Sequence, residues 1–211
     1  MTEQLMVKQE RAARTRETLI RSAAEVFDHD GFSAASLTSI SSRAGVSNGA
    51  LHFHFASKAV LVDVVEEAAL TRLLAVTNGA LSLGVSHVQI LVDVTHALAG
   101  ELCGDVVLRV GFALSGDTSR PSRMDLRGRW RCWVEETLKQ AEAEGELRRG
   151  VTVQDVVTAV VAATVGFEVL GVRDSTWLSA STVARFWRLL LPTLVPAVRL
   201  DGIEAGGTRR P

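Results

Sequence analysis

The sequence predicts an all-α protein. Apolar residues recur with the three-to-four-residue spacing of amphipathic helices along most of the chain, and no segment shows the alternation of a half-buried strand. The composition agrees with this, because 47% of the residues are hydrophobic but only 5% are aromatic, so that aliphatic residues dominate. A chain of 211 residues can hold one large domain or two small ones with a substantial core.

The first predicted helix runs from about Ala13 to His29. Its buried face is a set of apolar residues at i, i+3 and i+4 spacing: Leu19, Ile20, Ala23, Ala24 and Phe27. We expect Gly31 to end this helix, because glycine commonly follows a helix C-terminus. Residues 1–10 are expected to form a loose N-terminal arm.

Two short helices with a tight turn between them are predicted next. Ser36 is a suitable N-cap for a helix over Leu37 to Ala44. Gly45 can take the positive φ that a tight turn requires, and Ser47 then caps a third helix that reaches about Phe53. This is the spacing of a helix-turn-helix, in which the second helix of the pair enters the major groove of DNA.

The stretch from Gly31 to Val62 contains no aspartate or glutamate, although the whole chain has 24 acidic residues against 23 Lys and Arg. The stretch keeps hydroxyl groups, two histidines, Arg43 and Lys58, and Ser57 is a suitable cap for a fourth helix that begins at Lys58. A carboxylate would repel a phosphate backbone, whereas serine, threonine, histidine and lysine can donate to it. The pattern therefore predicts a surface for double-stranded DNA.

The residues expected at this DNA surface lie on the helix-turn-helix, at the start of the fourth helix and on the N-terminal arm and first helix. Ala50 is small enough to touch a thymine methyl group, and His52 and His54 can hold phosphates. Helix N-termini add a favourable dipole for phosphate. The complete set is Arg11, Arg14, Thr38, Ser47, Asn48, Gly49, Ala50, His52, His54 and Lys58.

Helical periodicity continues to the end of the chain. The expected helices after the DNA-binding region are Val60–Thr77, Val88–Leu102, Val106–Leu114, Trp130–Glu144, Val153–Val172 and Val183–Leu200, the last one kinked or ended by Pro192 and Pro196. This predicts a DNA-binding domain over residues 1–60, a second helical domain over residues 61–200, and a disordered Gly-rich tail over residues 201–211. Two long apolar helices in the second domain predict a homodimer.

Charge and targeting signals narrow the class of protein. The net charge of −1 is too small for an architectural protein that coats DNA. No secretory signal opens the chain, and the apolar run from Val156 to Val172 is short and contains Glu168, so we expect a buried helix, no membrane contact and a cytoplasmic protein. Cys103 and Cys132 have no paired-ligand spacing and are expected to be buried, reduced thiols.

The segment Thr18–Lys58 resembles the N-terminal domain of TetR-family repressors. The resemblance rests on the pair Gly31-Phe32, on "AGVS", on "GALHFHF" and on the Ser-Lys that opens the fourth helix. The segment "GALHFHFASK" is most similar to the corresponding segment in the γ-butyrolactone autoregulator receptor branch of actinomycetes. That branch usually has tyrosine where this chain has His52, and a histidine there is more similar to the pseudo-receptors of the branch, which answer to antibiotics or pathway intermediates.

This resemblance implies a repressor that leaves a palindromic operator when a small-molecule effector binds, in control of antibiotic production or export. "RWRCWVEETLKQAEAEGEL" is similar to the helix that brings a tryptophan into the effector cavity of these receptors, and Trp130 is the matching position. An indole offers an apolar face and one donor. Neighbours chosen by helical face are Trp133, Val94, Leu98, Val110, Phe112, Leu114, Val161, Val165 and Phe167.

A second hypothesis is a helical enzyme or carrier that holds a small molecule and whose N-terminal motif is accidental. No catalytic residue is predicted, since Ser47 lacks both a Gly-x-Ser-x-Gly context and a candidate base. His52 and His54 are two residues apart on a helix and point to different sides, which disfavours a metal site. We therefore expect no enzyme activity, no metal and no cofactor, with DNA, an effector and a second copy as the partners.

Overall fold

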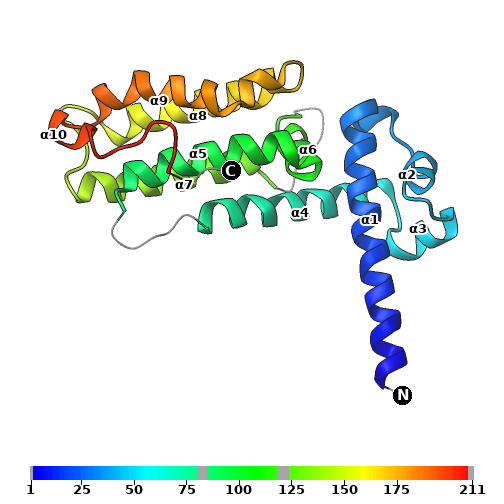
Figure 1. Cartoon of the computed structure of the whole chain (residues 1–211). Coiled ribbons are helices and arrows are strands. Elements are labelled where there is room, and N and C mark those ends of the chain that lie inside the picture. Colours follow the sequence, from blue (N-terminus) through cyan, green and yellow to red (C-terminus); the bar gives the residue numbers. More distant parts are fainter. Residues whose placement is uncertain (1, 80–84, 118–123, 209–211) are drawn as a thin grey trace.

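The computed structural model is built of helices, as the sequence predicts (Figure 1). It describes residues 2–79, 85–117 and 124–208, and no strand occurs within those ranges. The elements are α1 Thr2–Ala34, α2 Leu37–Arg43, α3 Asn48–His54, α4 Lys58–Asn78, α5 His87–Gly104, α6 Val106–Ser115, α7 Leu126–Ala143, α8 Val153–Gly171, the 3₁₀ turn η1 Ser175–Leu178, α9 Ala180–Leu194 and α10 Ala197–Leu200.

The N-terminal arm is a correction to the sequence prediction. Residues 2–10 are helical and continue into α1, because this segment contains good helix formers and neither glycine nor proline to stop it. Gly31 interrupts the helix where the sequence predicts its end, with φ of 78° and ψ of 157°. The last residues of α1 therefore run in a new direction and lead the chain into α2.

The three predicted serine N-caps are formed. The side chain of Ser36 accepts from Ser39 N in a capping box, that of Ser47 accepts from Ala50 N, and that of Ser57 accepts from Val60 N. Each hydroxyl satisfies a backbone N–H that has no partner within its own helix. Gly45 makes the turn between α2 and α3 with φ of 68°. Local sequence signals therefore set both ends of the helix-turn-helix.

Several boundaries in the second domain differ from the sequence prediction. Helix α7 begins at Leu126 rather than Trp130, because the Asp125 carboxylate accepts from Gly128 N and caps the extra turn. Pro192 lies inside α9 and does not end it, whereas Pro196 separates α9 from α10. Both cysteines are exposed and not buried as expected, since they lie on the outward sides of α5 and α7.

The Gly-rich tail is also a correction. Residues 201–208 lie along α5 (Figure 1) and are held by side chains of that helix. Gln89 accepts from Glu204 N at 2.7 Å, and the carboxylate of Asp93 accepts from Thr208 N at 2.8 Å. Ile203 and Ala205 pack against the core. Glycine-rich composition predicted disorder here, but distant side chains supply the partners that the backbone needs.

The two predicted domains share one connected core. Helices α1, α2 and α3 form the N-terminal part, which we call the reading head, and α4 leads from it along the second domain (Figure 1). The boundary predicted at residue 60 lies within α4. Helix α1 packs against both α4 and α6, while α8 and α9 form the layer farthest from α4 (Figure 1). The reading head is therefore in direct contact with the second domain.

Candidate nucleic-acid interface

Helix α3 presents one buried face and one exposed face. Leu51 is fully buried and Phe55 is 1% exposed, so these two residues fix α3 to the reading head, as their four-residue spacing predicts. Asn48, Gly49 and His52 lie on the exposed side with the cap Ser47. Ala50 and His54 are half-buried at its margins. The structure therefore places three of the predicted α3 residues on the open face and two at its edge.

The side chain of Asn48 is held in a defined orientation. Its Oδ1 accepts a hydrogen bond from the Ser41 hydroxyl at 2.5 Å, and Ser41 itself is buried on α2. The amide nitrogen of Asn48 is thus the part of the side chain that can donate to a base edge. A fixed side chain loses less conformational entropy on binding. Thr38, another candidate, is exposed on α2, the helix that carries Ser41.

Lys58, which the sequence predicts at the DNA surface, is bound by groups of the protein itself. Its Nζ donates to the carbonyl oxygens of Phe32, Ser33 and Ala35 at 2.6, 3.3 and 2.8 Å. An ammonium group has three donors, so these bonds use all of them, and no donor is left for a phosphate. Nζ also lies 4.4 Å from the centroid of the Phe32 ring. Lys58 is therefore a cap for the C-terminal end of α1.

Arg43, the other cation in the acid-free stretch besides Lys58, is also tied to the protein. Its Nε donates to the Glu25 carboxylate at 2.7 Å and links α2 to α1. This bond to Arg43, helped by Arg21, lowers the pKa of Glu25. Arg11 and Arg14, two of the predicted phosphate contacts, are exposed one turn apart on α1.

Phe53 is a candidate that the sequence analysis missed. It is 83% exposed on α3, although an exposed phenylalanine is unfavourable in water. The signal was present in the sequence, since Leu51 and Phe55 point inward and the residue midway between them must point outward. The Phe53 ring lies edge-on to His54 with 5.3 Å between centroids. An apolar ring at this place is suited to a thymine methyl group or a deoxyribose.

The residues predicted around an effector lie mostly in one packed core. Trp130 is 1% exposed, its Nε1 donates to the Thr164 hydroxyl at 2.8 Å, and its ring stacks on Trp133 with 5.3 Å between centroids. The buried members of the predicted set are Val94, Leu98, Val110, Phe112, Leu114 and Phe167, while Val161 packs against their edge. Val165 is half-buried and stands outside this cluster.

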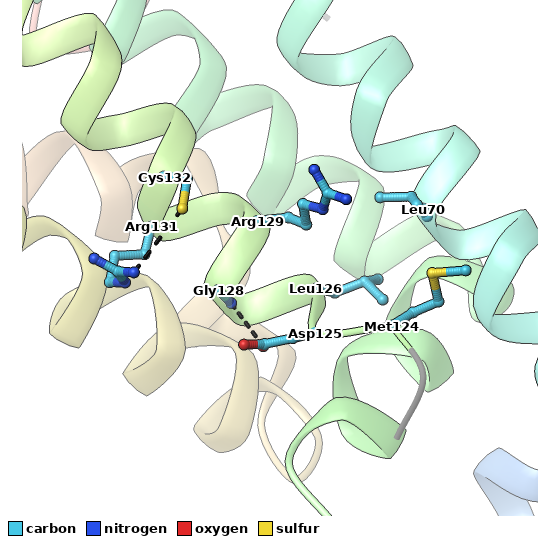
Figure 2. A pocket seen from close by; sticks show the side chains of 8 residues that line it. All are labelled: Leu70, Met124, Asp125, Leu126, Gly128, Arg129, Arg131 and Cys132. Atoms are coloured by element: carbon cyan, nitrogen blue, oxygen red, sulfur yellow. Dashed lines mark hydrogen bonds between the residues drawn. The ribbon is translucent and has the colours of Figure 1, made fainter. Parts of the chain in front are cut away.

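A hollow of about 360 Å³ lies between α4 and α7 and is lined by Leu70, Arg129 and Cys132 among others (Figure 2). Trp130 is not among its lining residues. Within the described residues, the buried Nε1 of Trp187 on α9 lacks a hydrogen-bond partner, which is unusual for an indole. Its place in the sequence carried no signal of this.

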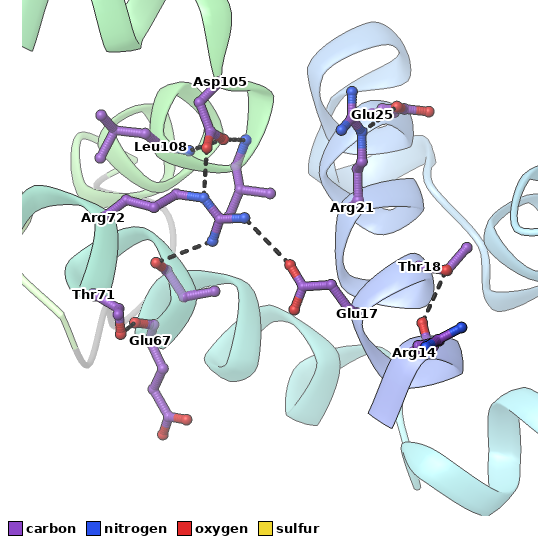
Figure 3. A network of polar contacts seen from close by, with 12 residues as sticks. Arg14, Glu17, Thr18, Arg21, Glu25, Glu67, Thr71, Arg72, Asp105 and Leu108 are labelled. Atoms are coloured by element: carbon purple, nitrogen blue, oxygen red, sulfur yellow. Dashed lines mark hydrogen bonds and ion pairs between the residues drawn. The ribbon is translucent and has the colours of Figure 1, made fainter. Parts of the chain in front are cut away.

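Ion pairs join the reading head to the second domain (Figure 3). Arg72 on α4 donates through Nε to Asp105 at 2.5 Å and through Nη2 to Glu17 of α1 at 3.4 Å. Arg109 on α6 pairs with Asp28 of α1 at 2.8 Å, and this hydrogen bond raises the pKa of the arginine. These pairs place charged contacts across the surface along which α1 meets α4 and α6.

Comparison with known proteins agrees with this architecture. The sequence profile described as "Bacterial regulatory proteins, tetR family" matches residues 19–65. The A-factor receptor protein of Streptomyces griseus is 29% identical over 195 residues, which cover 90% of this chain and 67% of that protein.

Solved structures extend the likeness to the second domain. A γ-butyrolactone receptor described as ArpA-like is 27% identical with a TM-score of 0.81, over 93% of this chain and 96% of that one. CprB of Streptomyces coelicolor, solved with its operator sequence, is 26% identical with a TM-score of 0.77, over 91% of this chain and 94% of that one. Residues 19–65 therefore form a DNA-binding domain of the tetR family of bacterial regulatory proteins, and the whole chain is similar in fold to γ-butyrolactone receptors.

Proposed function

We propose that this protein is a cytoplasmic, ligand-responsive transcriptional repressor that binds a palindromic operator as a homodimer and leaves it when a small-molecule effector binds. The observation that carries the proposal is the exposed, acid-free side of α3, with Asn48 held by Ser41 and Phe53 open to solvent. A surface without carboxylates beside a preorganised amide suits the major groove. CprB, whose structure is known with operator DNA, has the same fold.

The dimer is proposed from the unburied apolar surface of α8 and α9. By length and composition, helix α8 is apolar enough to cross a membrane. Only 33% of its most apolar 18-residue window is buried within the single chain, so most of this apolar helix is left uncovered. Val169 is 51% exposed on α8 and Leu189 is 80% exposed on α9. Glu168, buried on the same helix and paired with Arg127, fits a protein core better than a bilayer. A second copy is the occupant that family architecture supports.

The effector is proposed to be a γ-butyrolactone-like signal, an antibiotic or a biosynthetic intermediate, which ties the repressor to antibiotic production or export. The support is the likeness to proteins named A-factor receptor and γ-butyrolactone receptor. The core around Trp130 is the proposed binding place, and an effector there has to displace the Thr164 contact to reach the indole donor. The histidine at position 52 is similar to that of the pseudo-receptors, and it favours an antibiotic or a pathway intermediate as the ligand.

The proposal is tested with labelled DNA taken from upstream of the protein's own gene. The wild-type protein should shift this DNA specifically, with the shift reversed by the effector. Asn48→Ala should relax sequence preference at one base pair by about 1–3 kcal/mol, because one donor to a base edge is lost. Competition gel shifts with single-base operator variants measure this.

The matched control is Thr71→Ala, which removes a hydroxyl bonded to its own helix on α4, away from the reading head. The control should bind with wild-type preference. A wild-type protein without specific binding to this DNA favours the second hypothesis, a helical carrier or enzyme with an accidental motif. Equal preference in Asn48→Ala and wild type contradicts the docking of α3.

A further inference from the structure

A groove of about 690 Å³ lies on the side of α5 that faces away from the Trp130 core. Its walls come from α4, α5, the start of α9 and the C-terminal tail. The lining residues that matter here are Arg72, Val76, His96, Gly100, Glu101 and Gly207. A volume of this size is within the range of pockets for drug-sized ligands, roughly 300–1,000 Å³.

The groove is hollow because short side chains line it. Ala97 and Gly100 face it from α5, and a Cβ built on Gly100 meets no atom within 4 Å. The tail forms a wall through Gly206 and Gly207, and this wall is built in place, since the Asp93 carboxylate holds the backbone and hydroxyl of Thr208. The groove is therefore a shaped part of the fold.

The polar groups of the groove indicate the class of ligand. Arg72, Asp93 and Glu101 are the charged side chains of a lining whose other residues are mostly small or apolar, so the groove favours a largely apolar ligand. His96 bonds to the Ala205 carbonyl and Asp93 to Thr208, whereas Arg72 uses three of its five N–H donors in its contacts with Asp105, Ala68 and Glu17. Two donors of Arg72 and the exposed Glu101 carboxylate remain for a ligand that carries an acceptor and a hydroxyl.

Arg72 links this groove to the reading head. Arg72 lines the groove, and its guanidinium holds Asp105 at the start of α6 and reaches Glu17 of α1 at 3.4 Å (Figure 3). The bond to Glu17 is the longest of the three, and Glu17 is 66% exposed, so it is the easiest to exchange for a ligand oxygen. A ligand that takes Arg72 from Glu17 removes one contact between α4 and α1.

We propose that this groove is a second ligand site, separate from the Trp130 core, for a neutral apolar molecule with keto and hydroxyl oxygens, and that its occupation weakens operator binding through Arg72. The effect on DNA rests on the proposed function, whereas the binding itself does not. A ligand shifts the equilibrium between DNA-competent and released forms by its differential affinity for the two.

The test uses the full-length protein and the neutral, keto-bearing dye Nile red, whose fluorescence reports an apolar site. Wild type should bind the dye saturably, and the dye should weaken binding to the upstream DNA. Gly100→Leu and Ala97→Leu each fill the groove and should lower dye affinity by about tenfold or more. Both variants should still bind the DNA, which shows that they are folded. The dye should no longer weaken this DNA binding.

The matched control is Cys103→Leu, which adds an exposed leucine to α5 one turn beyond Gly100 and outside the groove. This control should bind the dye like wild type. Absence of saturable binding to wild type, or a dye affinity in both groove variants equal to that of wild type, overturns the site. Loss of binding in Trp130→Phe but not in Gly100→Leu moves the dye to the Trp130 core and also overturns it.

Two outcomes test the ligand site in the groove and the proposed repressor function independently of each other. Dye that binds in the groove without changing the DNA shift overturns the regulatory link through Arg72. A wild-type protein that ignores the upstream DNA contradicts the proposed function, and the dye titration with Gly100→Leu and Cys103→Leu still decides the groove.

Discussion

Lys58 and Arg43 are the two strong cations within the acid-free stretch, and both are bound by groups of the protein itself. Lys58 caps three carbonyl oxygens near the end of α1, and Arg43 is paired with Glu25. In the proposed docking, phosphate is therefore contacted by the hydroxyls, histidines and helix N-termini of the stretch rather than by these two cations. Arg11 and Arg14, which lie outside the stretch, are exposed and remain predicted phosphate contacts.

Replacing Lys58 should expose the difference between a structural and a phosphate-binding lysine. Lys58→Met should lower the free energy of unfolding by about 1–3 kcal/mol, because three carbonyl oxygens lose a charged donor. The slope of log affinity against log salt should stay unchanged, since no phosphate contact is removed. Urea unfolding and gel shifts at several salt concentrations measure the two effects. A slope reduced by about one unit would restore Lys58 as a phosphate ligand.

Trp130 is a single residue with two possible roles, core packing and effector binding. Trp130→Phe keeps a large ring but loses the donor to Thr164, so operator binding should persist. Release should require about tenfold more effector, if the effector takes over this N–H. The control is Trp187→Phe, which removes the buried indole donor on α9 that lacks a described partner. Equal release by wild type and Trp130→Phe would leave Trp130 as a core residue.

The helix-turn-helix is an element whose ends are specified locally. Ser36, Ser47 and Ser57 each bond a backbone N–H three residues ahead, and Gly45 supplies the one left-handed residue between α2 and α3. These interactions span few residues, so they form wherever the sequence has them. The position of α3 on the reading head then follows from the buried pair Leu51 and Phe55.

Gly45 and Gly49 give a matched pair of substitutions in this element. Gly45→Ala should destabilise the protein by about 1–2 kcal/mol, because a Cβ is strained at φ of 68° although it meets no neighbour. Gly49 lies within α3, and a Cβ there has Ser47 Oγ at 3.9 Å as its nearest atom, so Gly49→Ala should not destabilise the fold. Urea denaturation compares the two variants. Equal stability for both would contradict the turn geometry.

At the scale of the whole molecule, one chain leaves a large apolar surface uncovered. Val169 of α8 and Val172, directly after this helix, are exposed, and Leu189 is exposed on the neighbouring α9. The two helices lie in the layer farthest from α4 (Figure 1), so a partner can cover them without touching the reading head. The proposed dimer then carries two copies of α3 for two operator half-sites.

A charge in the proposed dimer surface should separate the copies. Leu189→Glu should give a monomer in sedimentation at micromolar protein and should weaken operator binding strongly, because each half-site alone is bound weakly. The control is Val198→Glu, which changes an equally apolar residue that is 91% exposed on α10. The control should remain a dimer with wild-type DNA binding. A Leu189→Glu dimer would place the interface on another surface.

The sequence by itself determined the all-α fold, the caps and turn of the helix-turn-helix, and the inward-facing pair Leu51 and Phe55. These features depend on periodicity and on contacts within about four residues, which any local stretch of sequence displays. The family resemblance rested on the same region, and the profile match over residues 19–65 agrees with it.

The tertiary structure alone decided the features that depend on residues far apart in the chain. Lys58 donates to carbonyl oxygens some twenty-five residues earlier, and the tail is held by Gln89 and Asp93, more than a hundred residues away. The groove beside Arg72 likewise exists because four separate segments meet there. Such contacts follow from how helices pack, and no local pattern in the sequence encodes the partner.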